Sequence, residues 1–167
     1  MKTKHLFIAL LLAASKVWAE PIDDGISAYF NANYETAIRI LGPMADGGEA
    51  SAQYVMGLMY TDGKGVKQDY VEAVKWYRLA ASQGIAPAQF SLGIRYEKGQ
   101  GVTQDYAEAL EWYRLSATQG FEPAQHNLGL MYGGGRGTTK DYGEAAKWLH
   151  LAAAQENKSA QYVLAGC

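Results

Sequence analysis

The 167-residue chain holds a single cysteine, Cys167, so no disulfide can form within it. It has only four prolines, which argues against a proline-rich disordered chain. Neither sign of charge dominates, with 15 Lys and Arg against 17 Asp and Glu. Nucleic-acid-binding proteins usually carry a basic patch or stripe, and none is evident here. We therefore expect a fold held by packing alone, and no nucleic-acid partner.

The one long apolar run lies at the start of the chain. LFIALLLAA covers residues 6–14, after Lys2 and Lys4 and before Val17–Trp18–Ala19. This pattern predicts a signal peptide over residues 1–19. A membrane anchor is the alternative, but the run is shorter than the roughly 20 apolar residues that a bilayer requires. The sequence thus predicts an exported protein, most simply periplasmic but with extracellular release open, and no membrane span after cleavage.

Removal of residues 1–19 would leave 12 basic and 17 acidic side chains, a formal charge of −5. Export would also place Cys167 in an oxidising compartment. That cysteine either pairs with a second chain or stays unpaired at the chain end, and the sequence leaves both open.

Short motifs recur every 36 residues along the chain. They are Ala-Gln from positions 52, 88, 124 and 160, a glycine at 57, 93 and 129, Gly-x-Gly from 63, 99 and 135, and Asp-Tyr from 69, 105 and 141. A period of this length predicts a repeat protein, because each unit buries its apolar face only against its neighbours.

Each unit reads as two helices, which we name helix A and helix B. In the second unit, helix A is predicted from about Pro87 to about Glu97, since proline suits a first helical turn. Gly93 recurs at the same place in every unit, which indicates a helix B that crosses too closely for a Cβ. Helix B follows the N-cap Asp105, with Glu108 completing a capping-box pattern.

Helix B is expected to end at a glycine, Gly84 or Gly120, and in the third unit at Asn157. Its predicted buried stripe in the second unit consists of Tyr106, Ala109, Trp112, Tyr113 and Ser116. The recurring tryptophans are likewise predicted to be core residues: Trp76, Trp112 and Trp148.

Units such as AQYVMGLMYTDGKGVKQDYVEAVKWYRLAASQG resemble the Sel1-like repeat, a relative of the tetratricopeptide repeat. The resemblance covers about residues 50–166 and implies an all-α, α/α superhelical solenoid that acts as a protein-interaction scaffold. We divide the chain into a signal peptide (1–19), a divergent N-terminal hairpin (20–48), three repeats (49–85, 86–121 and 122–157) and a partial fourth repeat or cap (158–167).

The resemblance also implies that helix A lines a concave face, where a partner peptide or helix would bind. Residues beside the core stripe recur there at i, i+4 and i+7, on one helical face. They are Tyr54, Leu58, Thr61, Phe90, Ile94, Glu97, His126, Leu130 and, less informatively, Gly133. The alternative is that this row simply packs between adjacent helices, as aromatic stripes often do.

No catalytic constellation, metal site or cofactor is predicted. Outside the leader, the histidines are His126 and His150, and no HExxH or Ser-x-x-Lys motif occurs. The Gly-rich loop at residues 133–137 lacks the pattern of a phosphate-binding loop. The cysteine-rich branch of the resembled family is associated with β-lactamase or penicillin-binding activity, but this chain lacks its paired cysteines. That activity, and self-assembly through the C-terminal end, are the alternatives to a non-enzymatic adaptor.

Overall fold

The computed structural model describes residues 21–155, and within them all regular secondary structure is helical. The predicted all-α class is therefore confirmed. The expected signal peptide, the Asn157 cap, the partial fourth repeat and Cys167 lie outside the described residues. Residues 21–30 are helical, and a turn at residues 31–33 connects them to the next helix. Seven 13-residue helices follow: α2 (Tyr34–Asp46), α3 (Ala50–Asp62), α4 (Tyr70–Ser82), α5 (Ala86–Lys98), α6 (Tyr106–Thr118), α7 (Glu122–Gly134) and α8 (Tyr142–Ala154).

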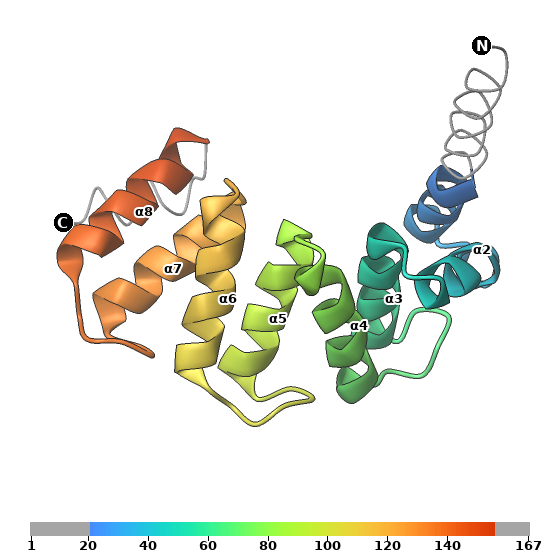
Figure 1. Ribbon diagram of the computed structural model, residues 1–167, viewed down its shortest axis with the longest axis horizontal. Coiled ribbons are helices and arrows are strands. Elements are labelled where there is room, and N and C mark those ends of the chain that lie inside the picture. Colours follow the sequence, from blue (N-terminus) through green and yellow to red (C-terminus); the bar gives the residue numbers. More distant parts are fainter. Residues whose placement is uncertain (1–20, 156–167) are drawn as a thin grey trace, which may run out of the picture.

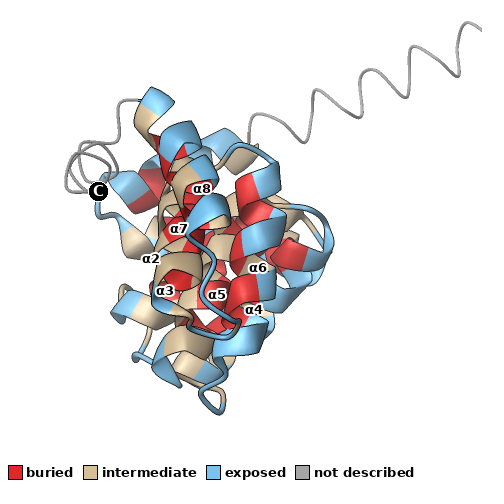
Figure 2. Cartoon of the chain, turned by 90° about the vertical axis from the view of Figure 1, so that its left-hand side faces the viewer, coloured by how far each residue is buried: buried red, intermediate tan, exposed pale blue. Residues whose placement is uncertain are grey.

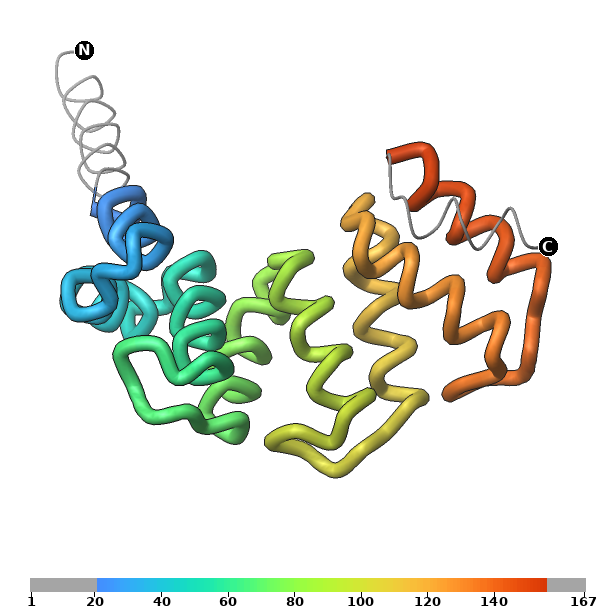
Figure 3. Tube along the Cα trace, turned by 180° about the vertical axis from the view of Figure 1, so that it is seen from behind, coloured from blue at the N-terminus to red at the C-terminus, as the bar shows by residue number. Residues whose placement is uncertain are grey.

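The helices form an arch of stacked hairpins (Figure 1). Helices α3, α5 and α7 are the A helices of the three repeats, and α4, α6 and α8 are their B helices. Extensive contacts among the described helices run only between consecutive ones. The Gly-x-Gly loops lie along the outer edge of the arch, and the short turns between hairpins lie along its inner edge (Figures 1 and 3). This is the predicted α/α repeat solenoid.

Each B helix begins at an aspartate that satisfies free backbone N–H groups. The Asp105 carboxylate accepts from the N–H groups of Ala107 (2.9 Å) and Glu108 (3.1 Å), which confirms its predicted capping role. The other bond of the predicted capping box, from the Asp105 N–H to the Glu108 side chain, does not form, so that part of the prediction is wrong. The Asp105 N–H donates to the Tyr96 carbonyl of the preceding helix (3.0 Å), and its equivalents in the other repeats do the same. Each cap therefore also fastens helix B to helix A.

The mid-helix glycines mark the closest approach within each hairpin. A Cβ on Gly93 would lie 2.7 Å from the Tyr113 ring, and one on Gly57 would lie 2.5 Å from the Tyr77 ring. A Cβ on Gly129 would meet Leu149 at 2.7 Å. Real Cβ atoms do not approach other atoms so closely, so the prediction of a close helix crossing is confirmed.

The glutamine of the recurring Ala-Gln pair is a buried link between hairpins. Gln89 is 6% exposed, and its amide donates to the Ala81 carbonyl at the end of α4 (3.2 Å). Its carbonyl accepts from Gln119 at the end of α6 (2.7 Å). Gln53 and Gln125 make the same two bonds in their repeats. A buried polar side chain requires such partners, which explains why this residue recurs.

Buried residues lie mainly where neighbouring helices face each other (Figure 2). In α6, Ala109, Tyr113 and Ser116 are fully buried as predicted. The prediction of burial was wrong for Tyr106, which is exposed. It was too strong for Trp112, which is only half-buried. The indole N–H of Trp112 has no partner among the described residues. The tyrosine that follows the tryptophan, not the tryptophan, fills the hairpin core in the first two repeats, whereas Trp148 is buried in the third.

Candidate functional site

All members of the predicted helix A row are half-buried. Each therefore contributes to packing and is also partly exposed at the surface. The row comprises Tyr54, Leu58 and Thr61 on α3, Phe90, Ile94 and Glu97 on α5, and His126, Leu130 and Gly133 on α7.

The aromatic members rest on rings from other helices. Tyr54 packs against Tyr77 of α4 with 6.1 Å between ring centroids. Burial is the main cause that raises the pKa of Tyr54. Phe90 packs against Tyr113 (5.5 Å) and Phe121 (5.4 Å). Part of the row thus packs between adjacent helices, which was the alternative interpretation, and that packing fixes the position of the rings.

The polar members bond the buried tyrosines of helix B. The Thr61 hydroxyl lies 2.9 Å from the Tyr77 hydroxyl. In the second repeat, Tyr113 donates to one oxygen of Glu97 (2.6 Å), and Arg136 from the third Gly-rich loop pairs with the other (2.9 Å). Burial, and next the Glu97 carboxylate, raise the pKa of Tyr113 well above its ordinary value. Arg136 therefore has a definite role, which is to tie the third repeat to the second.

His126 ends the aromatic row with a free ring atom. Its Nδ1 is buried and has no hydrogen-bond partner among the described residues. Ile94, one turn from Phe90, packs against the hydrophobic cluster around Tyr113, and Leu58 contacts the two clusters on either side of it. The row thus combines anchored rings with an imidazole whose buried Nδ1 is unsatisfied among the described residues.

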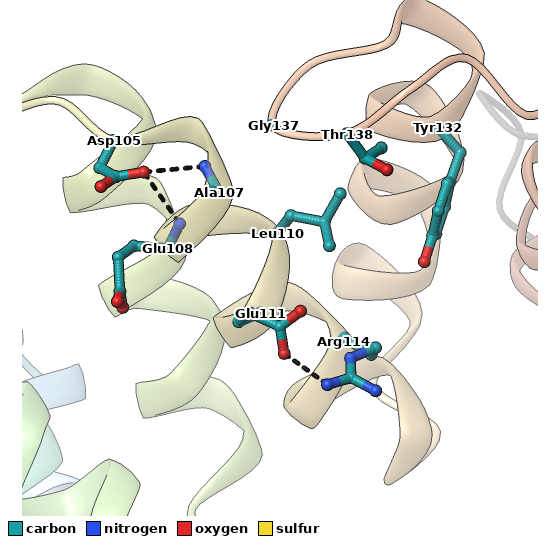
Figure 4. A pocket seen from close by; sticks show the side chains of 9 residues that line it. All are labelled: Asp105, Ala107, Glu108, Leu110, Glu111, Arg114, Tyr132, Gly137 and Thr138. Atoms are coloured by element: carbon teal, nitrogen blue, oxygen red, sulfur yellow. Dashed lines mark hydrogen bonds and ion pairs between the residues drawn. The ribbon is translucent and has the colours of Figure 1, made fainter.

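A second feature, which the sequence did not predict, is a pocket between α6 and the A helix and loop of the next repeat (Figure 4). Its volume is about 440 Å³. The residues that decide its character are Glu108, Glu111, Arg114, Tyr132 and Thr138. We name it the α6–α7 pocket; it shares no residue with the helix A row. The sequence signal that could have revealed it is a charge change, Lys75 to Glu111 to Lys147, at one repeat position.

Within residues 21–155, no group of three or more metal-ligating side chains is close enough to hold an ion. No helix in this range has the length and apolar character that crossing a membrane requires.

Comparison with known proteins identifies the repeat. The sequence model of the Sel1 repeat matches residues 50–85, 86–121 and 122–157. The chain belongs to the Sel1 repeat family. It is thus a helical repeat protein, and Sel1 repeats generally mediate protein interactions. No curated protein sequence matches it significantly.

Two solved Sel1-type structures are similar over most of this chain. A Sel1 repeat protein from Oxalobacter formigenes has a TM-score of 0.80 and 37% identity, with 83% of this chain and 57% of that one covered. A protective antigen present in uropathogenic Escherichia coli strains, which displays an SLR fold, has a TM-score of 0.81 and 38% identity over 90% of this chain and 33% of that one. The chain therefore spans only part of the length of both.

Cysteine rich protein B of Helicobacter pylori shares the fold, with a TM-score of 0.62 and 18% identity over 77% of this chain and 92% of that one. At this identity the likeness concerns the fold alone.

Proposed function

We propose that this Sel1 repeat protein is an exported adaptor that binds an extended peptide or a helix of a partner protein along the helix A row. The export part of the proposal rests on the signal-peptide pattern at residues 1–19. The binding part rests on one observation: the equivalent residues Tyr54, Phe90 and His126 occur on three successive A helices, each half-buried.

Such a row suits recognition because its side chains are held before a partner arrives. Tyr54 and Phe90 already pack on rings of helix B, so binding costs them little conformational entropy. Aromatic anchors that present one apolar face typically contribute most to peptide affinity. The half-buried imidazole of His126 adds a polar side chain to the end of the row.

The proposal is tested by selecting ligands from a displayed random-peptide library on residues 20–167 of the protein, and then measuring affinity for three variants. Phe90→Leu keeps apolar volume but removes the ring, and His126→Ala removes the imidazole. We expect each to weaken the selected peptides by about tenfold, the loss of one anchor. Leu79→Ala, on the exposed side of α4, is the matched control and should bind as the wild type does.

Thermal melts of all three variants separate loss of binding from loss of folding. Peptides that bind the Phe90 and His126 variants as tightly as the wild type would show that the row is only a packing feature.

A further inference from the structure

The α6–α7 pocket differs from the equivalent place one repeat earlier, and the difference lies in one arginine. In the first repeat, the Arg78 guanidinium reaches across to the next A helix. It donates to the Tyr96 hydroxyl (2.8 Å) and lies 5.9 Å from the centre of the Tyr96 ring. The protein thus supplies its own guanidinium to this tyrosine.

In the second repeat, Arg114 and Tyr132 stand at the equivalent positions but do not bond. Arg114 instead forms an ion pair with Glu111, one turn earlier on the same helix (Figure 4). The Tyr132 hydroxyl consequently has no hydrogen-bond partner within the described part of the chain. The pocket is lined by both of these side chains, Arg114 and Tyr132, which are not bonded to each other.

A single change of charge accounts for the difference. Position 75 in the first repeat is a lysine, which pairs with Glu72 and leaves Arg78 free to reach Tyr96. At the equivalent position the second repeat has Glu111, which attracts Arg114 at i+3. Glu108, the equivalent of Glu72, consequently has no side-chain partner among the described residues.

The lining is suited to a cation. The lining holds three carboxylates, those of Asp105, Glu108 and Glu111, and one guanidinium, that of Arg114, so it has a formal charge of −2. Asp105 caps α6 and Glu111 pairs with Arg114, which leaves the Glu108 carboxylate without a partner among the described residues. Thr138, where the first repeat has Val102, adds a hydroxyl to the wall. Tyr132 offers both a ring face and a free phenol oxygen. A planar guanidinium can stack on such a ring and bond the oxygens beside it, which an ammonium does less well.

We propose that the α6–α7 pocket binds an arginine side chain of a partner protein, in the place that Arg78 takes within the first repeat. This pocket is separate from the helix A row, so the proposal does not depend on whether the row binds a peptide. The bound arginine would come from an extended, exposed segment of the partner protein.

The test uses the full exported chain and capped tripeptides, with amide chemical shifts as the readout. Acetyl-Gly-Arg-Gly-amide should shift the signals of Glu108, Tyr132 and Thr138 at millimolar concentrations. Acetyl-Gly-Gln-Gly-amide should not shift them. Absence of shifts with the arginine peptide, or equal binding of the glutamine or the corresponding lysine peptide, would overturn the proposal.

Glu111→Lys tests whether the charge at this position decides the partner of Arg114, because it restores the lysine found at position 75 of the first repeat. Arg114 should then bond Tyr132 and fill the pocket, and affinity for the arginine peptide should fall by about tenfold or more. The reciprocal variant, Lys75→Glu, should draw Arg78 from Tyr96 and create a second binding site. Both positions are exposed, so melting temperatures should change little. A Glu111 variant that binds as tightly as the wild type would contradict the assignment.

Discussion

At the scale of single residues, the hairpin core is defined by how closely two helices cross. Gly93 faces the Tyr113 ring, and a methyl group there would also lie 3.3 Å from the Ala109 carbonyl. Gly93→Ala should therefore destabilise the protein by about 1–2 kcal/mol, since overpacking outweighs the gain of about 1 kcal/mol in helix propensity. Denaturant unfolding of the variant measures the change.

Gly133→Ala is the control for this prediction. It lies on α7, and its added Cβ would be 3.6 Å from the nearest atom, an ordinary contact. The same substitution should here stabilise the protein by up to about 1 kcal/mol. A stabilising Gly93→Ala would show that the close crossing carries no energetic cost.

The buried tyrosines make stability depend on alkaline pH. Burial raises the pKa of Tyr77 to about 12, against about 10 in an unfolded chain. The unfolded state therefore loses this proton first, so the contribution of Tyr77 to stability is complete below about pH 10 and is lost as the pH rises towards about 12. Tyr77→Phe should reduce the pH dependence of the melting temperature in that range, and an unchanged pH profile would refute it.

The buried stripe of helix B shows what periodicity can and cannot predict. The helical spacing correctly placed Ala109 and Ser116 inside, but it could not decide between the adjacent aromatics Trp112 and Tyr113. The decision depends on a long-range partner: the Tyr113 hydroxyl reaches the Glu97 carboxylate, 16 residues away. Local pattern carries no information about such a bond.

At the scale of elements, hairpins are joined by the glutamine links. Gln89→Leu would remove the bond to the Ala81 carbonyl, which keeps the Gly84 N–H (3.0 Å), and would leave the Gln119 amide without its partner. For the loss of two hydrogen bonds we expect a destabilisation of about 1–3 kcal/mol. Gln119→Leu should cost less, because Gln89 then keeps its bond to Ala81. A double-mutant cycle measures the coupling, and strict additivity would show that the two side chains do not interact energetically.

Helix boundaries followed from local signals to within about one residue. Helix α5 was expected from about Pro87 to about Glu97 and spans Ala86–Lys98. Aspartate caps and the left-handed glycines Gly84 and Gly120 were identified correctly because both act on the adjacent backbone. The α6–α7 pocket was missed because it depends on whether Arg114 pairs with Glu111 or bonds Tyr132. That side-chain conformation follows only from the neighbours in three dimensions.

At the scale of the whole molecule, the described helices contact mainly their neighbours in the chain. Stability in such a solenoid is approximately the sum of repeat and interface terms. Hydrogen exchange should therefore be slowest in α5 and α6, which have hairpins on both sides, and faster in α2. Uniform protection along the chain would instead indicate a single cooperative unit.

The central claim is that the helix A row is where a partner protein docks. A photo-crosslinking amino acid placed at position 90 in the producing cell tests it most directly, with position 79 on the exposed side of α4 as the control. The account predicts a discrete protein adduct from position 90 and none from position 79. An adduct from position 79 alone would contradict it.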